Sequence, residues 1–203
     1  VRVFPVPTGT AANALSLAAV CPPFGAVYCS ADAHINTSEC NATGFFSGGA
    51  KMVPVASEFG KVDPAALETA IAGAGVGLAH KSQPAAVNLV QATDLGAVYR
   101  VEEIAAVAKV AHAHGLKVHM DGARFANAVA RLGCTPGEAT WKAGVDILSF
   151  TPNWHVVQRL MLQSFLEKGD FCWHCHTGIF SYPMWIALEK KVPLIFWGEP
   201  SAE

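Results

Sequence analysis

The sequence predicts an α/β fold in which helices cover a mainly parallel β-sheet. The main observation is an alternating order, because short β-rich apolar runs are separated by stretches whose apolar residues recur at helical spacing. Hydrophobic residues make up 52% of the 203 residues, which is ample for a buried core. No uncharged apolar run reaches the roughly 18 residues that a membrane-spanning helix needs, so we expect no membrane partner.

The alternation begins at the N-terminus. Residues 1–6 predict a strand, and the apolar stretch 11–20 predicts a helix because it follows the short turn Thr8–Gly9–Thr10. A buried strand is expected at 26–30 and a short strand at 51–55, where two consecutive glycines break the chain before the second strand. These elements give the order strand, helix, strand, strand.

The next helix has a clear start. Asp63 can cap free backbone N–H groups, and Pro64 gives up a donor that would have no partner in the first turn, so residues 65–72 are predicted to be helical. A β-rich run follows at 86–90. Residues 101–114 carry apolar side chains at helical spacing, with two acidic residues in the first turn, and predict a second long helix.

The remaining elements continue the pattern up to a change in composition. They are a strand at 116–120, helices at 125–132 and 136–143, and a strand at 145–150. Beyond this point tryptophan, phenylalanine and tyrosine become frequent, although the preceding chain is poor in them. We therefore expect an α/β domain over residues 1–150 and a different, aromatic-rich segment over residues 151–203.

Composition also excludes some functions. The 14 basic and 16 acidic side chains give a formal net charge of -2 without a basic cluster, so nucleic acid is not an expected partner. The six cysteines lack the spacing of a small secreted domain, which favours reduced thiols in the cytoplasm. The stretch 11–20 has no adjoining cleavage site, so it predicts a helix and not a signal peptide.

Two short motifs suggest chemistry. Gly9 and Thr10 could offer backbone N–H groups and a hydroxyl to a phosphate at the start of a helix, where free donors and the helix dipole favour an anion. The alternative is a plain turn, because short Gly-Thr turns are common. Asp121 ends a predicted parallel strand, where ligands of such sheets gather, and Arg124 follows three residues later.

A carboxylate at position 121 could keep a pyridine nitrogen protonated, and the guanidinium of Arg124 could bind a substrate carboxylate or a phenolic oxygen. The alternative is a helix-capping aspartate with a surface arginine. His34 follows the strand 26–30 and could lay its imidazole against a cofactor ring, or it could be a loop histidine that faces solvent. Together these motifs suggest a pyridoxal phosphate enzyme.

No metal site is expected among the histidines of the α/β domain. His112 and His114 are two residues apart on a predicted helix, so they point in different directions. His119 lies in a predicted strand and is expected to pack on one face of the sheet.

Several short stretches of sequence carry a resemblance to a known family. They are Pro7–Asn13, Ala33–Ile35, Glu39, Phe46–Gly48, Gln83–Ala86, Gln91–Gly96, His119–Arg124 and Ala143–Phe150. In this order, from Val3 to about Phe150, the chain resembles the low-specificity threonine aldolase and β-eliminating lyase family of fold type I pyridoxal phosphate enzymes.

The resemblance implies an incomplete fold type I large domain that binds pyridoxal 5'-phosphate. It places Gly9 and Thr10 at the phosphate, His34 as a catalytic group stacked on the ring, and Asp121 at the pyridine nitrogen. Arg124 would orient the cofactor or the carboxylate of the amino acid. The resemblance also implies a homodimer and retro-aldol cleavage of a small β-hydroxy-α-amino acid to glycine and an aldehyde.

One departure from the family bears on activity. In the family, the lysine that holds the cofactor as a Schiff base follows the strand end within a few residues, and an ungapped comparison puts Trp154 at that position. Lys142 precedes the strand and Lys168 lies far beyond it, so neither is an expected substitute. We expect an impaired aldolase-type lyase. The alternative is a scaffold that binds the cofactor without catalysis.

The segment after residue 151 has a different resemblance. Residues 158–203, notably 165–180 and 193–203, resemble part of an N-acetyl sugar amidotransferase of lipopolysaccharide biosynthesis, which implies that two unrelated sequences meet near residue 151. Cys172 and Cys175 lie in a C-x-x-C-H pattern that could hold zinc. Neighbouring ligands converge poorly on a tetrahedral ion, so we expect an unmetallated cluster, with an amidotransferase-derived or zinc-binding fragment as the alternative.

Overall fold

The computed structural model describes residue 6 and residues 8–146, together with residues 159, 162–163 and 165–167. The chain divides into two compact units, one formed by residues 8–147 and the other by residues 1–7 and 148–203. In the second unit, the described residues between 159 and 167 are helical, and Gln163 donates a hydrogen bond to Glu167 at 2.8 Å. All elements named below belong to the first unit.

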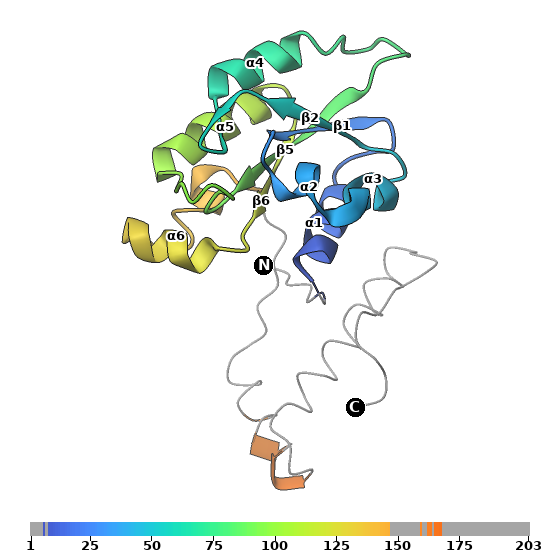
Figure 1. Ribbon diagram of the computed structural model, residues 1–203. Helices are drawn as coiled ribbons and strands as arrows, with labels where there is room; N and C mark the ends of the chain where they lie inside the picture. Colours follow the sequence, from blue (N-terminus) through green and yellow to red (C-terminus); the bar gives the residue numbers. More distant parts are fainter. Residues whose placement is uncertain (1–5, 7, 147–158, 160–161, 164, 168–203) are drawn as a thin grey trace. The chain divides into compact units, whose positions relative to one another are not determined.

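Four parallel strands form the central sheet of this unit (Figure 1). Their order across the sheet is β2 (Lys51–Val55), β1 (Gly25–Ser30), β5 (Gln83–Val90) and β6 (Lys117–Asp121). The register sets Val90, the last residue of β5, opposite Asp121, the last residue of β6. The predicted strands at 26–30, 51–55, 86–90 and 116–120 are confirmed, as is the mainly parallel sheet.

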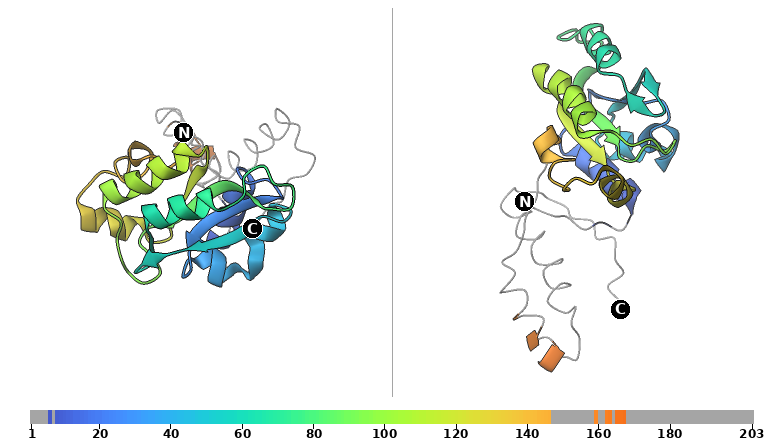
Figure 2. Two further views of the ribbon diagram at one scale, coloured as in Figure 1. Left: turned by 90° about the horizontal axis from the view of Figure 1, so that it is seen from above. Right: turned by 90° about the vertical axis from the view of Figure 1, so that its left-hand side faces the viewer.

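Helices cover both faces of the sheet (Figure 1 and Figure 2). One face packs against α4 (Pro64–Ala72) and α5 (Val101–Ala113), and α1 (Gly9–Ala18) lies on the other. The two faces divide the side chains of β5, because Val87 and Leu89 join the core under α4 and α5 whereas Ala86 and Val90 join the core that contains Leu17 of α1. Alternate residues of a strand point to opposite faces, which explains this division.

The long helices were predicted from periodicity, and α1, α4, α5 and α6 (Phe125–Leu132) confirm them with shifts of one or two residues at some ends. The predicted strand 1–6 lies outside the described residues except for Val6, which is in no regular element. Of the predicted strand 145–150, only residues 145 and 146 are described, and the N–H of Asp146 bonds to the carbonyl of Val118 in β6 at 3.0 Å.

The predicted helix at 136–143 is wrong. This stretch forms a series of turns that ends in one 3₁₀ turn, η2 (Trp141–Ala143). Two backbone hydrogen bonds, from Lys142 to Gly137 and from Val145 to Thr140, span five residues instead of the four of an α-helix. Gly144 has a φ of +100°, which turns the chain toward β6. The helical spacing of apolar residues in 136–143 therefore does not decide the structure, because the chain must turn to bring Asp146 to β6.

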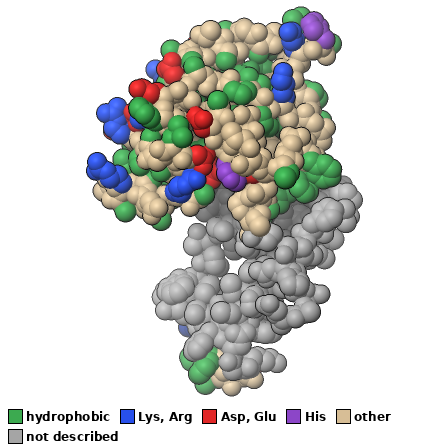
Figure 3. Space-filling view, in the orientation of Figure 1, with side chains coloured by type: hydrophobic (Ala, Val, Ile, Leu, Met, Phe, Trp, Pro, Cys, Tyr) green, Lys and Arg blue, Asp and Glu red, His purple; other side chains and the backbone are tan. Residues whose placement is uncertain are grey.

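The region between β1 and α4 contains short elements that periodicity could not reveal. They are α2 (His34–Thr37), the 3₁₀ helix η1 (Glu39–Asn41), α3 (Ala42–Phe46) and the antiparallel hairpin β3 (Ser57–Glu58) and β4 (Lys61–Val62). Hydrophobic side chains gather over α3 (Figure 3), where Phe45 and Phe46 are 77% and 51% exposed. Among the described residues, no helix is both long and apolar enough to cross a membrane.

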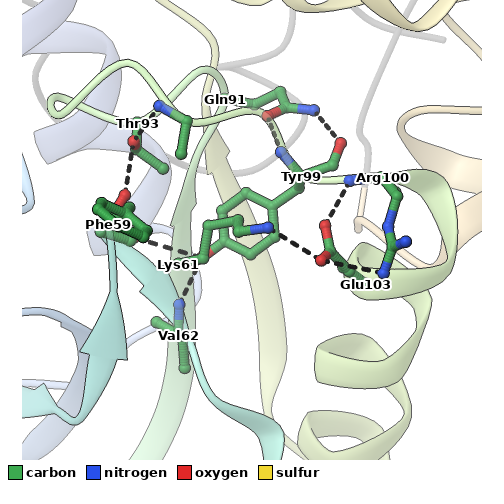
Figure 4. Close-up of polar contacts among 10 residues, drawn as sticks. Phe59, Lys61, Val62, Gln91, Thr93, Tyr99, Arg100 and Glu103 are labelled. Carbon is green, nitrogen blue, oxygen red and sulfur yellow. Dashed lines mark hydrogen bonds and ion pairs between the residues drawn. The ribbon is translucent and has the colours of Figure 1, made fainter.

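The loop between β5 and α5 is fixed by side-chain hydrogen bonds (Figure 4). The Gln91 amide closes it, because its Nε2 donates to the carbonyl of Tyr99 at 2.9 Å and its Oε1 accepts from the N–H of Tyr99 at 3.0 Å. Thr93 Oγ1 donates to the carbonyl of Phe59 at 2.8 Å, and the Tyr99 hydroxyl accepts from the N–H of Val62 at 2.7 Å. The loop is thereby tied to the β3–β4 hairpin.

We expect Tyr99→Phe to lower the free energy of unfolding of the full chain by about 1–3 kcal/mol, because it leaves the buried N–H of Val62 without its acceptor. Urea denaturation followed by circular dichroism would measure the change. Tyr28→Phe is the matched control, since Tyr28 is equally buried at 2% exposure but its hydroxyl makes no hydrogen bond to another described residue. Equal losses in the two variants would contradict the expectation.

Candidate active site

The candidate site lies at the carboxyl ends of the strands. β1, β5 and β6 end at Ser30, Val90 and Asp121, and in a parallel sheet these ends share one edge. Ligands of α/β sheets bind at this edge because the loops that leave it converge there. The amino-terminal half of α1 reaches the same edge, since Asn13 of α1 bonds to Asp121.

The start of α1 presents two backbone N–H groups to the surface. Thr8 is the N-cap, and its side-chain oxygen accepts from the N–H of Ala11 at 3.1 Å while its carbonyl accepts from Ala12 at 3.0 Å. The N–H groups of Gly9 and Thr10 precede these bonds, so helix geometry provides them with no intrahelical acceptor. A Cβ added at Gly9 would meet nothing within 4 Å, which shows open space beside this backbone.

Asp121 is a buried carboxylate with two different partners. Its Oδ1 accepts from the N–H of Ala123 at 3.0 Å, within the turn before α6. The N-cap of α6 is Arg124, so the helix-capping alternative for Asp121 is wrong. Its Oδ2 accepts from the Asn13 side chain at 2.9 Å, although 108 residues separate the two in the chain. The side chain therefore serves the local turn and faces the candidate site at once.

His34 lies on the short helix α2 and its side chain is 48% exposed. Its Nδ1 is 2.8 Å from Glu39 Oε1, and the Glu39 side chain is only 1% exposed. Asn13 Nδ2 donates to the same carboxylate oxygen at 2.9 Å. A chain of hydrogen bonds thus joins His34, Glu39, Asn13 and Asp121.

Arg124 pairs with the loop that follows β5. Its guanidinium lies 2.6 Å from Asp94 Oδ1 and donates to the carbonyl of Ala92 at 3.2 Å. The Arg124 side chain is 41% exposed, so part of the guanidinium faces outward. The surface-arginine alternative and the ligand-binding alternative are both compatible with this position.

The pKa of His34 reflects these neighbours. The hydrogen bond to Glu39 raises the pKa of His34, and the nearby charges of Asp94 and Asp121 raise it further, while partial desolvation opposes them. The site therefore combines residues from α1, α2, η1, β6 and the loop after β5. Sequence reasoning assigned no role to Asn13, Glu39 or Asp94, although the family resemblance passed through all three.

Lys142, which is not an expected substitute for the cofactor-binding lysine, is among the described residues. Lys142 lies four residues before Asp146, which pairs with Val118 and with Lys117 near the amino end of β6. That end of the strand is opposite to Asp121, so Lys142 does not approach the candidate site. Trp154 and Lys168 lie outside the described residues.

The other histidines of the domain have separate partners. His112 lies 3.0 Å from Asp146, and His114 lies 2.8 Å from Glu68, as expected for two side chains that point in different directions. Within residues 8–146 and the few described beyond them, no group of three or more His, Cys, Asp or Glu side chains could hold a metal ion. Cys172 and Cys175, the candidate zinc ligands, lie outside the described part.

His119 packs on the sheet as the sequence predicted. Its Nδ1 lies 2.7 Å from Asn88 Oδ1, the residue opposite it on β5. Burial lowers the pKa of His119 to about 4, because the imidazolium is poorly solvated there, and the charge of Asp121 opposes this only in part. The pKa of His34 and the pKa of His119 are therefore shifted in opposite directions.

Comparisons with known proteins agree with this geometry. Residues 2–153 match the family described as Beta-eliminating lyase. Low specificity L-threonine aldolases of a Pseudomonas species and of Pseudomonas aeruginosa are each 47% identical to the chain over 150 residues, which is 73% of this chain and 42% of theirs. A solved structure of Leishmania major threonine aldolase is 27% identical, with a TM-score of 0.55 over 60% of this chain and 34% of that one.

We expect His119 to make folding stability depend on pH. The unfolded chain takes up this proton near pH 6.5 and the folded chain only near pH 4, so the stability is complete above 6.5 and is lost as the pH falls to 4. The loss should reach about 1.4 kcal/mol per pH unit within that window. His119→Asn, which keeps a donor toward Asn88, should flatten the slope in urea titrations, whereas His80→Asn in an exposed loop should keep the slope of the unmodified chain.

Proposed function

This chain belongs to the β-eliminating lyase family, whose members depend on pyridoxal 5'-phosphate, and we propose that it keeps the family's cofactor site while its aldolase-type reaction is impaired. The observation that carries the proposal is a convergence. The start of α1, His34 and Asp121 come from distant parts of the chain and meet at one edge of the sheet through Asn13 and Glu39. The chain spans 42% of the length of the two Pseudomonas relatives, so the activity of a whole protein is part of the proposal.

The residues fit the cofactor in charge and in space. The cradle at Gly9 is open, and the helix N-terminus favours an anion such as a phosphate. Each oxygen of an ionised carboxylate can accept more than one hydrogen bond, so Asp121 keeps capacity for a pyridinium N–H beside its two present donors. Asp94 Oδ2 is buried and has no hydrogen-bond partner among the described residues, so the carboxylate that pairs with Arg124 is only partly satisfied.

Each side chain has a proposed role that follows from its position. The N–H groups of Gly9 and Thr10 would bind the phosphate, and Asp121 would hold the proton on the pyridine nitrogen. Arg124 is fixed by Asp94 and turns its outer N–H groups toward the substrate carboxylate. His34 takes the proton of the substrate β-hydroxyl at Nε2, because its Nδ1 is engaged by Glu39. When bound, pyridoxal phosphate supplies an electron sink for the charge left at Cα.

The proposed substrate is a small β-hydroxy-α-amino acid, which would be cleaved to glycine and an aldehyde. The names of the Pseudomonas relatives support this class. The proposed impairment rests on Trp154, which an ungapped comparison puts at the position of the family's Schiff-base lysine, and on Lys142, which lies toward the amino end of β6. A scaffold that binds the cofactor without turnover is therefore the second candidate function.

Two further proposals concern the remainder of the chain. We propose a homodimer, and the exposure of Phe45 and Phe46 on α3 supports it because large apolar side chains in adjacent positions favour association. We also propose that an α/β domain over 1–150 joins a different segment over 151–203, which the division of the chain near residue 147 supports. An amidotransferase-derived or zinc-binding role of that segment stays a prediction.

We expect Trp154→Lys to create a single site of covalent attachment for pyridoxal phosphate. After borohydride reduction and proteolysis, mass spectrometry should find the label on position 154 of the variant, and the unmodified chain should show only scattered labelling of surface lysines. His155→Lys, which shifts the new amine by one residue, is the control and should stay at the scattered level. A single labelled lysine in the unmodified chain would refute the proposed impairment.

We expect Asp121→Asn to weaken cofactor binding about ten- to hundredfold, because it removes a charged partner of the pyridine nitrogen. Equilibrium dialysis with pyridoxine 5'-phosphate measures this directly, since that analogue has no aldehyde to react with lysines. Asp63→Asn makes the same chemical change at the N-cap of α4 and should leave the affinity unaltered. Equal affinities of the Asp121 and Asp63 variants would argue against the proposed site.

A further inference from the structure

Two buried side chains connect the groups assigned to the cofactor. Glu39 Oε1 lies 2.8 Å from His34 Nδ1 and accepts from Asn13 Nδ2 at 2.9 Å. Asn13 Nδ2 also donates to Asp121 Oδ2 at 2.9 Å. Glu39 and Asn13 have no role in the proposed reaction, yet they are the only link between His34 and Asp121 that the described residues provide.

The chemistry of the partners fixes the direction of every bond in this chain. An ionised carboxylate only accepts, so the NH₂ group of Asn13 must face both Glu39 and Asp121, and the Nδ1 of His34 must carry a proton. Few side chains could replace Asn13, because its single nitrogen offers two donors to two acceptors. The proton on Nδ1 leaves Nε2 of the half-exposed His34 as the nitrogen that a ligand can address.

The backbone around Glu39 is strained. Glu39, Cys40 and Asn41 have φ angles of 61°, 48° and 57°, so three consecutive non-glycine residues occupy the left-handed region. Each such residue costs roughly 1–2 kcal/mol relative to ordinary backbone. Strain of this kind persists where the surrounding structure imposes it, and it is concentrated at functional sites.

The strained turn brings the Glu39 side chain inward. The side chain is 1% exposed, and its Oε2 is buried without a hydrogen-bond partner among the described residues. A buried carboxylate with one unsatisfied oxygen is costly, and a residue selected only for stability would not be expected there. Backbone strain and incomplete hydrogen bonding thus have one common result, which is a carboxylate held against His34.

We propose that Glu39 and Asn13 are positioning residues, in which Glu39 holds His34 in the Nδ1–H tautomer and Asn13 couples the orientation of His34 to that of Asp121. This inference rests on the proposed function, because it assigns His34 and Asp121, the first and last residues of this hydrogen-bonded series, to one cofactor. The same arrangement, a base oriented by a third group, recurs where an imidazole must accept a proton at a fixed place.

The environment of His34 provides a readout that needs no cofactor. Glu39 of η1, Asp94 of the loop after β5 and Asp121 of β6 all raise its pKa, and the hydrogen bond to Glu39 is the largest contribution. Arg124, a cation of the same candidate site, is paired with Asp94. Displacement of Glu39 should therefore lower the pKa of His34 even when no ligand is bound.

The experiment uses the full chain and Asn13→Ser, because a serine hydroxyl has one donor and can serve only one of the two carboxylates. The first readout is the NMR titration of His34 without cofactor, and the second is the affinity for pyridoxine 5'-phosphate by equilibrium dialysis. We expect Asn13→Ser to lower the pKa of His34, because Glu39 loses a donor that holds it against the imidazole. We also expect it to weaken binding about tenfold, because Asp121 loses the same donor. Glu39→Gln removes the charge beside the imidazole and should lower the same pKa.

Asn88→Ser is the matched control, because Asn88 is also a buried asparagine that bonds to a histidine, His119, on the same sheet. It should change neither readout. An unaltered titration of His34 in Asn13→Ser would overturn the proposal. If that variant does not fold, Glu39→Asp decides instead, since it keeps the charge and shortens the reach, and an unaltered pKa of His34 would again be contrary.

The two proposals fail in different ways. If the unmodified chain does not bind pyridoxine 5'-phosphate, the proposed cofactor site is wrong, and so is the proposed coupling of His34 and Asp121 at that site. The NMR titration would still show whether Asn13 and Glu39 position His34. If the unmodified chain binds the analogue but Asn13→Ser changes only the affinity, the cofactor site stands and the coupling through Asn13 is refuted.

Discussion

Two carboxylates buried at one edge of the sheet set the condition that the surrounding structure must meet. Glu39 and Asp121 are 1% and 7% exposed, and a buried charge is costly unless hydrogen bonds compensate it. The side-chain amide of Asn13 meets this need for both, because its nitrogen donates to each. As a consequence, α1 must lie with its amino-terminal half against the end of β6, and the turn at η1 must accept a strained backbone.

The parallel sheet makes this arrangement geometrically available. β1 and β6 are not neighbours, since β5 lies between them, yet their carboxyl ends share one edge. A chain that leaves β1 and a chain that leaves β6 therefore enter the same space, and His34 and Asp121 follow from that. Covering of both faces by α1, α4 and α5 keeps this edge as the place where loops and helix ends meet.

The groups proposed to bind the cofactor and the position at which it would be covalently attached lie in different parts of the sequence. The groups proposed to bind and orient the cofactor all lie between residues 9 and 124, whereas covalent attachment would depend on position 154, where the sequence has tryptophan. The loop from Gln91 to Tyr99 is closed by the Gln91 amide and is tied to the β3–β4 hairpin by Thr93 and Tyr99. Asp94 and hence Arg124 are placed by that loop.

Sequence alone determined the fold class, because the periods of 2 and 3.6 residues, the Asp63–Pro64 helix start and the alternation of elements are local properties. It also determined the family, through short stretches that include Gly9, His34, Asp121 and Arg124. The helix predicted at 136–143 is wrong, because the path of the chain to β6 prevails there over the local helical pattern. The sequence did not predict α2, η1 or the β3–β4 hairpin, because these elements are too short to show a period. Only the tertiary structure decided that Asn13 lies between Glu39 and Asp121, because partners 26 and 108 residues away are chosen by sheet order and helix docking, and no local pattern records them.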